Sequence, residues 1–114
     1  MTAMDSDRLR RVRESNDRFR RRANDLSGLI LSEGVWALSW DVRNMAVRKL
    51  AAYDAFDRHI DPYNVHDLGM FDLQGHRFLF RIDCHYANDS FISRSIESSL
   101  DEGRTLTLML LREC

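Results

Sequence analysis

Residues 77–86 read RFLFRIDCHY, and they carry the clearest β-strand pattern in the chain. Because successive side chains on a strand point to opposite faces of a sheet, strict alternation of two residue classes predicts one buried face and one polar face. The predicted core face holds Phe78, Phe80, Ile82, Cys84 and Tyr86. The opposite face holds Arg77, Leu79, Arg81, Asp83 and His85. We expect this second face to meet solvent or a partner if helices cover the first.

The segments on both sides extend this strand into a sheet. Residues 69–73 form another strand-like run, and Gly75 between the two runs supplies the positive φ that a tight hairpin needs. Residues 104–111 alternate threonine with leucine and predict the last strand. Residues 88–103, between these strands, are polar and rich in serine, and we expect one turn of helix at 92–96.

A basic helix is predicted over residues 6–26, which contain no glycine or proline and can begin at Asp5 or Ser6 as the N-cap. One seam of this helix recurs every three or four residues and comprises Leu9, Val12, Asn16, Phe19, Ala23 and Leu26. A buried Asn16 could set the register of a paired coil. The helix is shorter than three heptads, however, so we expect the seam to pack onto the sheet.

A second helix follows a short extended region. Gly28 ends the first helix, and residues 29–31 and 35–38 predict one or two short strands. Ser39 then offers an N-cap for a helix whose apolar residues recur at helical spacing to about Phe56.

The element order is therefore α-β-α-β-β-β, which predicts an α+β fold. We expect an antiparallel sheet of about four strands with two main helices packed on one face. With 114 residues, 44% hydrophobic and 31% charged, the chain fits a single domain over 1–114, made of the basic helix 6–26 and an α+β body 28–114. It has no apolar run long enough to span a bilayer and no signal peptide, so we expect a cytoplasmic protein without a membrane partner.

Residues 57–69, DRHIDPYNVHDLG, form an aperiodic loop that is dense in Asp, Asn and His. Histidine and carboxylate side chains gather only here and in the strand 77–86, and a divalent metal site could draw on His66, Asp67, Asp61, Asp83 and His85. The alternative is structural, because Asp61 before Pro62 typically starts a turn and Asn64 or Asp67 can bond to nearby backbone. A general-base role for His66 would need an orienting carboxylate, and no nucleophile is evident beside it.

The charge distribution is uneven, although 17 basic and 18 acidic residues give a net charge of −1. Residues 1–24 carry eight arginines against four acidic residues, whereas the rest of the chain is acidic. The basic helix could hold an acidic partner, through Arg10, Arg13, Arg18 and Arg21. The alternative is that the helix lies against its own acidic body or is solvated. Nucleic acid is a weaker candidate, since the helix has no interleaved aromatic residues. The five glycines never cluster into a phosphate-binding loop, and no cofactor is indicated.

Several segments resemble a small family of uncharacterised proteins that occur mainly in alphaproteobacteria, often on plasmids, phages and integrated elements. These segments are RVRESNDRFR (11–20), LSEGVWAL (31–38), DAFDRHIDPYNVHDLGMF (54–71), GHRFLFRIDCHY (75–86) and TLTLMLLREC (105–114). The most specific parts are the ND pair at Asn16 and Asp17, DPY followed by HDxG in 61–69, and IDxxY in 82–86. The resemblance implies a fold and a genomic setting but no reaction.

Three functions follow as hypotheses. The first is a non-enzymatic accessory protein of mobile elements, monomeric or dimeric, that binds a host or element protein and could inhibit a defence system such as CRISPR or restriction. Its interaction residues would be Arg77, Arg81, Asp83 and His85 with the arginines of the basic helix. The second is a small metal-dependent hydrolase or nuclease that uses the loop 57–69. The third is a DNA-binding regulator that acts as a dimer through the basic helix.

Overall fold

The computed structural model describes residues 3–25, 28–84 and 103–114. Three α-helices are present in this part of the chain, α1 (Ala3–Arg21), α2 (Glu33–Trp36) and α3 (Trp40–Ala51), with 3-10 turns η1 (Ala23–Asp25) and η2 (Leu111–Glu113). The strands are β1 (Leu29–Leu31), β2 (Leu68–Leu73), β3 (His76–Cys84) and β4 (Arg104–Leu110). No helix within the described ranges is long and apolar enough to cross a membrane.

The four strands form one mixed sheet in the order β1-β4-β3-β2. β2, β3 and β4 are antiparallel neighbours, as predicted, and Gly75 in the β2–β3 turn has φ +79°. β1 runs parallel to β4, so the prediction of a purely antiparallel sheet is wrong for this pair. The reason is topological: β1 pairs with the last strand in the sequence, and no hairpin constrains the direction of such a pair.

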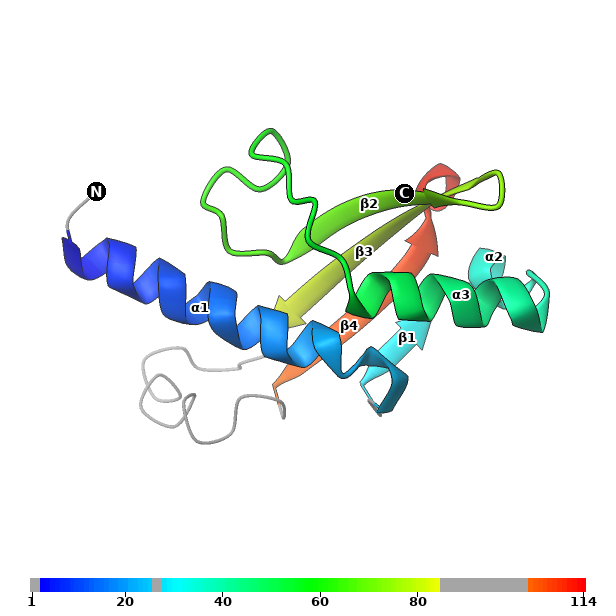
Figure 1. Ribbon diagram of the computed structural model, residues 1–114, viewed down its shortest axis with the longest axis horizontal. Helices are drawn as coiled ribbons and strands as arrows, with labels where there is room; N and C mark the ends of the chain where they lie inside the picture. The colour runs from blue at the N-terminus through cyan, green and yellow to red at the C-terminus, as the bar shows by residue number, and fades with distance from the viewer. Residues whose placement is uncertain (1–2, 26–27, 85–102) are drawn as a thin grey trace.

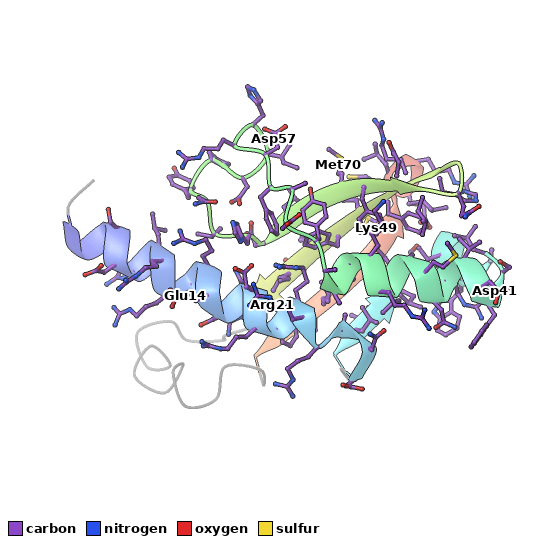
Figure 2. The ribbon with its side chains drawn as sticks, in the orientation of Figure 1. Glu14, Arg21, Asp41, Lys49, Asp57 and Met70 are labelled. Carbon is purple, nitrogen blue, oxygen red and sulfur yellow. The ribbon has the colours of Figure 1, made fainter. Side chains whose placement is uncertain are left out.

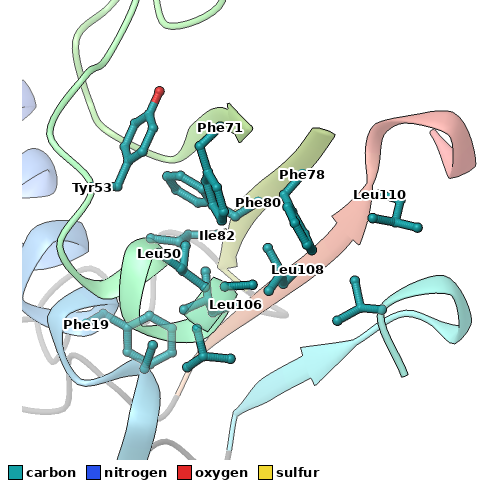
Figure 3. Close-up of a cluster of buried hydrophobic side chains, with 14 residues drawn as sticks. Phe19, Leu50, Tyr53, Phe71, Phe78, Phe80, Ile82, Leu106, Leu108 and Leu110 are labelled. Atoms are coloured by element: carbon teal, nitrogen blue, oxygen red, sulfur yellow. The ribbon is translucent and has the colours of Figure 1, made fainter. Parts of the chain in front are cut away.

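α1 and α3 lie in one layer against the sheet (Figure 1). The buried hydrophobic residues of all three helices belong to one cluster with alternate residues of β3 and β4 (Figure 3). The strand side chains in this cluster include Phe78, Phe80, Ile82, Leu106, Leu108 and Leu110. The prediction that Phe78, Phe80 and Ile82 face the core is therefore confirmed. Each of these buried large side chains stabilises the fold by about 1.5–3 kcal/mol relative to full exposure.

Two element boundaries differ from the prediction. The helix expected over 6–26 spans Ala3–Arg21, and a 3-10 turn completes its end. The helix expected to reach Phe56 ends at Ala51, where Ala52 leaves helical geometry. The rings of Tyr53 and Phe56 nevertheless meet edge to face at 4.7 Å beside the core, which explains why their spacing continues the apolar repeat.

Residues 35–38 do not form a strand. Ser32 accepts a hydrogen bond from the backbone N–H of Val35 and caps the short helix α2. Val35 is fully buried, so an apolar residue there reports burial rather than extended backbone. The predicted strand end at 85–86 and the helical turn at 92–96 lie outside the described residues.

Candidate functional site

The loop 57–67 is shaped by Asp61, whose side chain is buried against the backbone that follows it. Asp61 is 3% exposed, and its two carboxylate oxygens accept hydrogen bonds from the N–H groups of Val65 at 2.9 Å and His66 at 3.0 Å. Asn64 and His66 both have positive φ, 55° and 61°. Because non-glycine residues rarely adopt this conformation, Asp61 holds a turn that the chain would not otherwise favour.

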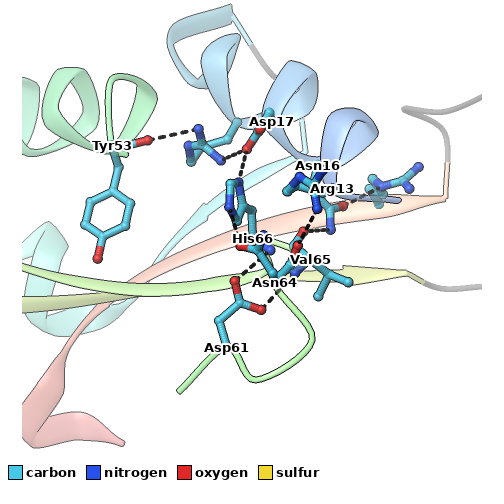
Figure 4. Close-up of polar contacts among 10 residues, drawn as sticks. Arg13, Asn16, Asp17, Tyr53, Asp61, Asn64, Val65 and His66 are labelled. Atoms are coloured by element: carbon cyan, nitrogen blue, oxygen red, sulfur yellow. Dashed lines mark hydrogen bonds and ion pairs between the residues drawn. The ribbon is translucent and has the colours of Figure 1, made fainter. Parts of the chain in front are cut away.

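Asn16 of α1 ties this loop to the sheet (Figure 4). Its Nδ2 donates to the carbonyl of Val65 at 2.9 Å, and its Oδ1 accepts from Nε of Arg104 on β4 at 3.1 Å. Arg13, one turn earlier, donates to the carbonyl of Asn64 at 3.3 Å. Asn16 is buried, and both of its side-chain hydrogen bonds go to other parts of its own fold.

Asp17 forms the centre of an ionic cluster between α1 and the loop. Its Oδ1 accepts from Nη1 of Arg20 at 2.8 Å and lies 2.8 Å from Nδ1 of His66. Burial raises the pKa of Asp17, but the hydrogen bonds and charges of Arg20 and His66 outweigh burial and bring its pKa below the ordinary value. The folded state therefore favours the ionised carboxylate.

The imidazole of His66 is held on three sides. Its Nε2 lies 3.0 Å from Oδ1 of Asn64, opposite the Asp17 contact, so both ring nitrogens lie within hydrogen-bond distance of a side-chain oxygen. Phe56 stacks on the ring with centroids 3.8 Å apart and planes 3° from parallel. The guanidinium carbon of Arg20 lies 5.0 Å from the centroid of the Phe56 ring. Nη2 of Arg20 also donates to the Tyr53 carbonyl at 3.0 Å.

A hollow of about 260 Å³ opens beside this cluster, lined in part by Asp17, Arg20, Tyr53, Phe56 and His66. The Asp17–His66 pair has the carboxylate-to-imidazole geometry that orients a general base. None of the described residues lining the hollow is a serine, threonine or cysteine, however, and Nε2 of His66 faces Asn64. The cluster holds α1 against the loop. We call this group of contacts the latch; it comprises Asn16, Asp17, Arg20, Phe56, His66 and Arg104.

The four predicted metal ligands that the structure describes, Asp61, His66, Asp67 and Asp83, do not converge on one point. Asp61 uses both oxygens on backbone N–H groups, and His66 turns toward Asp17. Burial raises the pKa of Asp67, and the charges of Asp61 and Asp83 add to this effect. Across the described ranges, no three His, Cys, Asp or Glu side chains are placed to hold a metal ion. His85 lies outside these ranges.

The face of the sheet opposite the helices, here called the outer face, has an apolar centre. Strand register places Met70, Leu79 and Met109 in one row across β2, β3 and β4. Leu79, in the middle of this row, is buried, and its two methionine neighbours are half-buried. The next row on the same face crosses β3 and β4 and ends on β1 at Ile30, whose side chain is 48% exposed.

Charged pairs border this apolar row on the same face. Nε of Arg81 donates to Asp83 at 2.9 Å, and Arg77 binds Asp72 through two hydrogen bonds of 2.8 and 3.2 Å. The Arg81 side chain is 55% exposed. The hydrogen bond from Arg77 lowers the pKa of Asp72. Of the predicted interaction residues, Arg77, Arg81 and Asp83 therefore share the outer face.

The predicted arginines of α1 do not share one role. Arg18 and Arg21 are exposed, and Arg10 is exposed beside Asp7 at 3.5 Å. Figure 2 shows Arg21 on α1 and Asp57 on the outer turn of the loop 57–67. Arg13, in contrast, is half-buried and donates to the loop.

Sequence reasoning missed the side chains of Asp17, Arg20, Phe56 and Arg104 as partners in the latch. The pairing of Asp17 with Arg20 has a local signal, since residues three apart on a helix are neighbours. Asp17 and His66 lie 49 positions apart, and no local pattern links them.

Two tryptophans are exposed at the α2–α3 corner. Trp36 is 59% and Trp40 68% exposed, and the guanidinium of Arg43 lies over the Trp36 ring. Arg43 also donates to the Trp36 and Leu38 carbonyls, which fixes the corner. Tyr63 on the loop is exposed as well.

Comparison with known proteins gives one family. The model of a family described as "Protein of unknown function (DUF3768)" matches residues 31–113. No curated protein and no solved structure matches the chain. The matched range contains β2, β3 and β4 with the loop and the latch residue His66, while α1 precedes it.

Proposed function

We propose that this chain, which belongs to the DUF3768 family of proteins of unknown function, is a non-enzymatic protein that binds another protein through the outer face. The observation that carries the proposal is the row Met70, Leu79 and Met109, bordered by exposed ion pairs on the face opposite the helices. An apolar centre with a charged rim is the usual composition of a protein interface.

The residue types on this face suit binding better than folding. Methionine adapts its side chain to irregular surfaces and recurs at protein-binding sites. Exposed ion pairs such as Arg81–Asp83 contribute only about 0–1 kcal/mol to stability. Because the fold gains little from them, these charges are free to exchange partners in a complex. The occupant we infer is a folded protein with an apolar strip and charges of both signs at its edge.

The family match supports this face over α1. Residues of the outer face, including Arg77 and Arg81, lie within 31–113, whereas the arginines of α1 precede the matched range. A function that belongs to the family as a whole is therefore better placed on the sheet than on the basic helix.

The setting that we propose is the cytoplasm of a bacterium that carries mobile elements. A chain of this size suits an accessory protein that occupies a functional surface of its target. The target would be a host or element protein, and a defence protein of the CRISPR or restriction type is one such target.

The test is capture of partners from a bacterial lysate treated with nuclease, followed by mass spectrometry and binding measurements with the purified partner. We expect one stoichiometric protein that binds the wild-type chain. The affinity of this protein should fall at least tenfold with Arg81→Glu. Arg48→Glu, an equal charge reversal on an exposed position of α3, is the matched control and should bind normally. Equal binding by both variants would refute the outer face, as would capture of a second copy of the chain alone.

A further inference from the structure

A second concave surface lies where the β2–β3 turn meets the end of β4. This groove has a volume of about 400 Å³ and is lined by Gly75, His76, Arg77, Leu110, Leu111 and Arg112. Leu110, a core residue, and the half-buried Leu111 form its apolar part, and among the described residues that line the groove every ionisable side chain is basic. From this charge complementarity we propose that the groove binds an acidic segment of the protein partner, with an apolar side chain on the leucines.

The basic groups of the groove differ in how far they are already engaged. Arg77 is paired with Asp72 by two hydrogen bonds. Arg112 lies next to Glu113, but the Glu113 carboxylate accepts from Ser32 Oγ at 2.6 Å and from the backbone N–H of Gly34 at 2.9 Å.

Glu113 also accepts from the backbone N–H of Leu110 at 2.8 Å. The hydrogen bond from Ser32, followed by those from Leu110 and Gly34, lowers the pKa of Glu113, and the charge of Arg112 adds to this effect. The Glu113 carboxylate therefore stays ionised and is bound to donors other than Arg112. Arg112 and His76 are therefore the groups that meet a carboxylate from outside.

The turn leaves this side of the groove open. Gly75 has positive φ, and a Cβ built on it meets no atom within 4 Å. Arg77 lies both on the outer face and in the groove, so the groove continues the proposed interface. The inference rests on the proposed function to this extent: one partner would cover the outer face and insert an acidic segment beside it.

The experiment is an NMR titration of the full chain with the blocked tetrapeptide Asp-Leu-Glu-Leu, and with its amide counterpart Asn-Leu-Gln-Leu. We expect shifts centred on Gly75, His76 and Arg112 with the acidic peptide, and affinity about five- to tenfold weaker in Arg112→Glu. The control variant Arg48→Glu should titrate like wild type. Spectra of the free variants establish that each is folded before titration.

Three results would overturn the groove assignment: no shifts at these residues, equal shifts with the amide peptide, or shifts centred on α1. If the peptide titration fails but Arg81→Glu loses partner binding, the groove assignment is wrong and the outer-face proposal stands. A peptide response in the groove, with partner binding unaffected by Arg81→Glu, would keep the groove and remove the proposed function.

Discussion

Replacing Asp61 by alanine should lower the free energy of unfolding by about 2–4 kcal/mol. The carboxylate is buried and accepts two backbone N–H groups, at 2.9 and 3.0 Å. Hydrogen bonds to a charged group contribute roughly 1.5–3 kcal/mol each, and we discount their sum because Val65 and His66 are only half-buried and water can reach the turn in the variant.

The loss should spread from the loop to α1. Val65 and His66 present the carbonyl and the imidazole that hold Asn16 and Asp17, so a loosened turn weakens the latch as well. Urea denaturation in the presence of a chelator, monitored by circular dichroism, measures the total loss in the free energy of unfolding.

Asp57→Ala is the matched control for this variant. Asp57 also accepts a backbone N–H, that of His59 at 2.8 Å, but it is exposed and makes one such bond. Its replacement should cost less than about 1 kcal/mol. If Asp61→Ala unfolds at the same urea concentration as wild type in chelator, and metal stabilises only the wild type, Asp61 is a metal ligand and the structural role assigned to it is wrong.

Two further predictions concern the core and the latch. The pKa of Asp17 is lowered in the fold, so the stability that its carboxylate contributes is present above its unfolded pKa near 3.8 and is lost as pH falls through the lower folded pKa. Asp17→Asn should therefore be less stable than wild type at pH 7. In urea titrations this difference should shrink toward pH 2. Gly69→Ala places a Cβ 2.5 Å from the Phe80 ring and 2.7 Å from the Tyr53 ring, and should cost about 1–3 kcal/mol, whereas Gly75→Ala meets open space and should cost about 1 kcal/mol through its positive φ. Equal midpoints for the two glycine variants and wild type would contradict the packing described for Gly69.

The sequence alone predicts the elements that depend on local pattern. Alternation in β3 and β4 identifies the core face, because a strand of a two-layer fold repeats every second residue. Ser39 caps α3 as expected, since a hydroxyl before an amphipathic run satisfies free N–H groups at a helix start. The direction of β1 is not predictable in this way, because three residues carry no record of which strand they pair with.

The latch shows where sequence reasoning stops. Asp61 was open to two interpretations, a metal ligand or a turn former, and only the position of the N–H groups of Val65 and His66 distinguishes them. A carboxylate beside His66 was required for any general-base role, yet the one present is Asp17, supplied by a helix far away in sequence. Long-range contacts of this kind are set by packing of the whole fold.

The central claim, that the outer face binds a protein, is tested most directly by hydroxyl-radical footprinting of the chain with and without its captured partner. Met70 and Met109 lie on the outer face, and the exposed Met45 on α3 is an internal control on the helical layer. We predict that the partner slows oxidation of Met70 and Met109 severalfold and leaves Met45 unchanged. Protection of Met45 alone, or no protection of Met70 and Met109, would contradict the account.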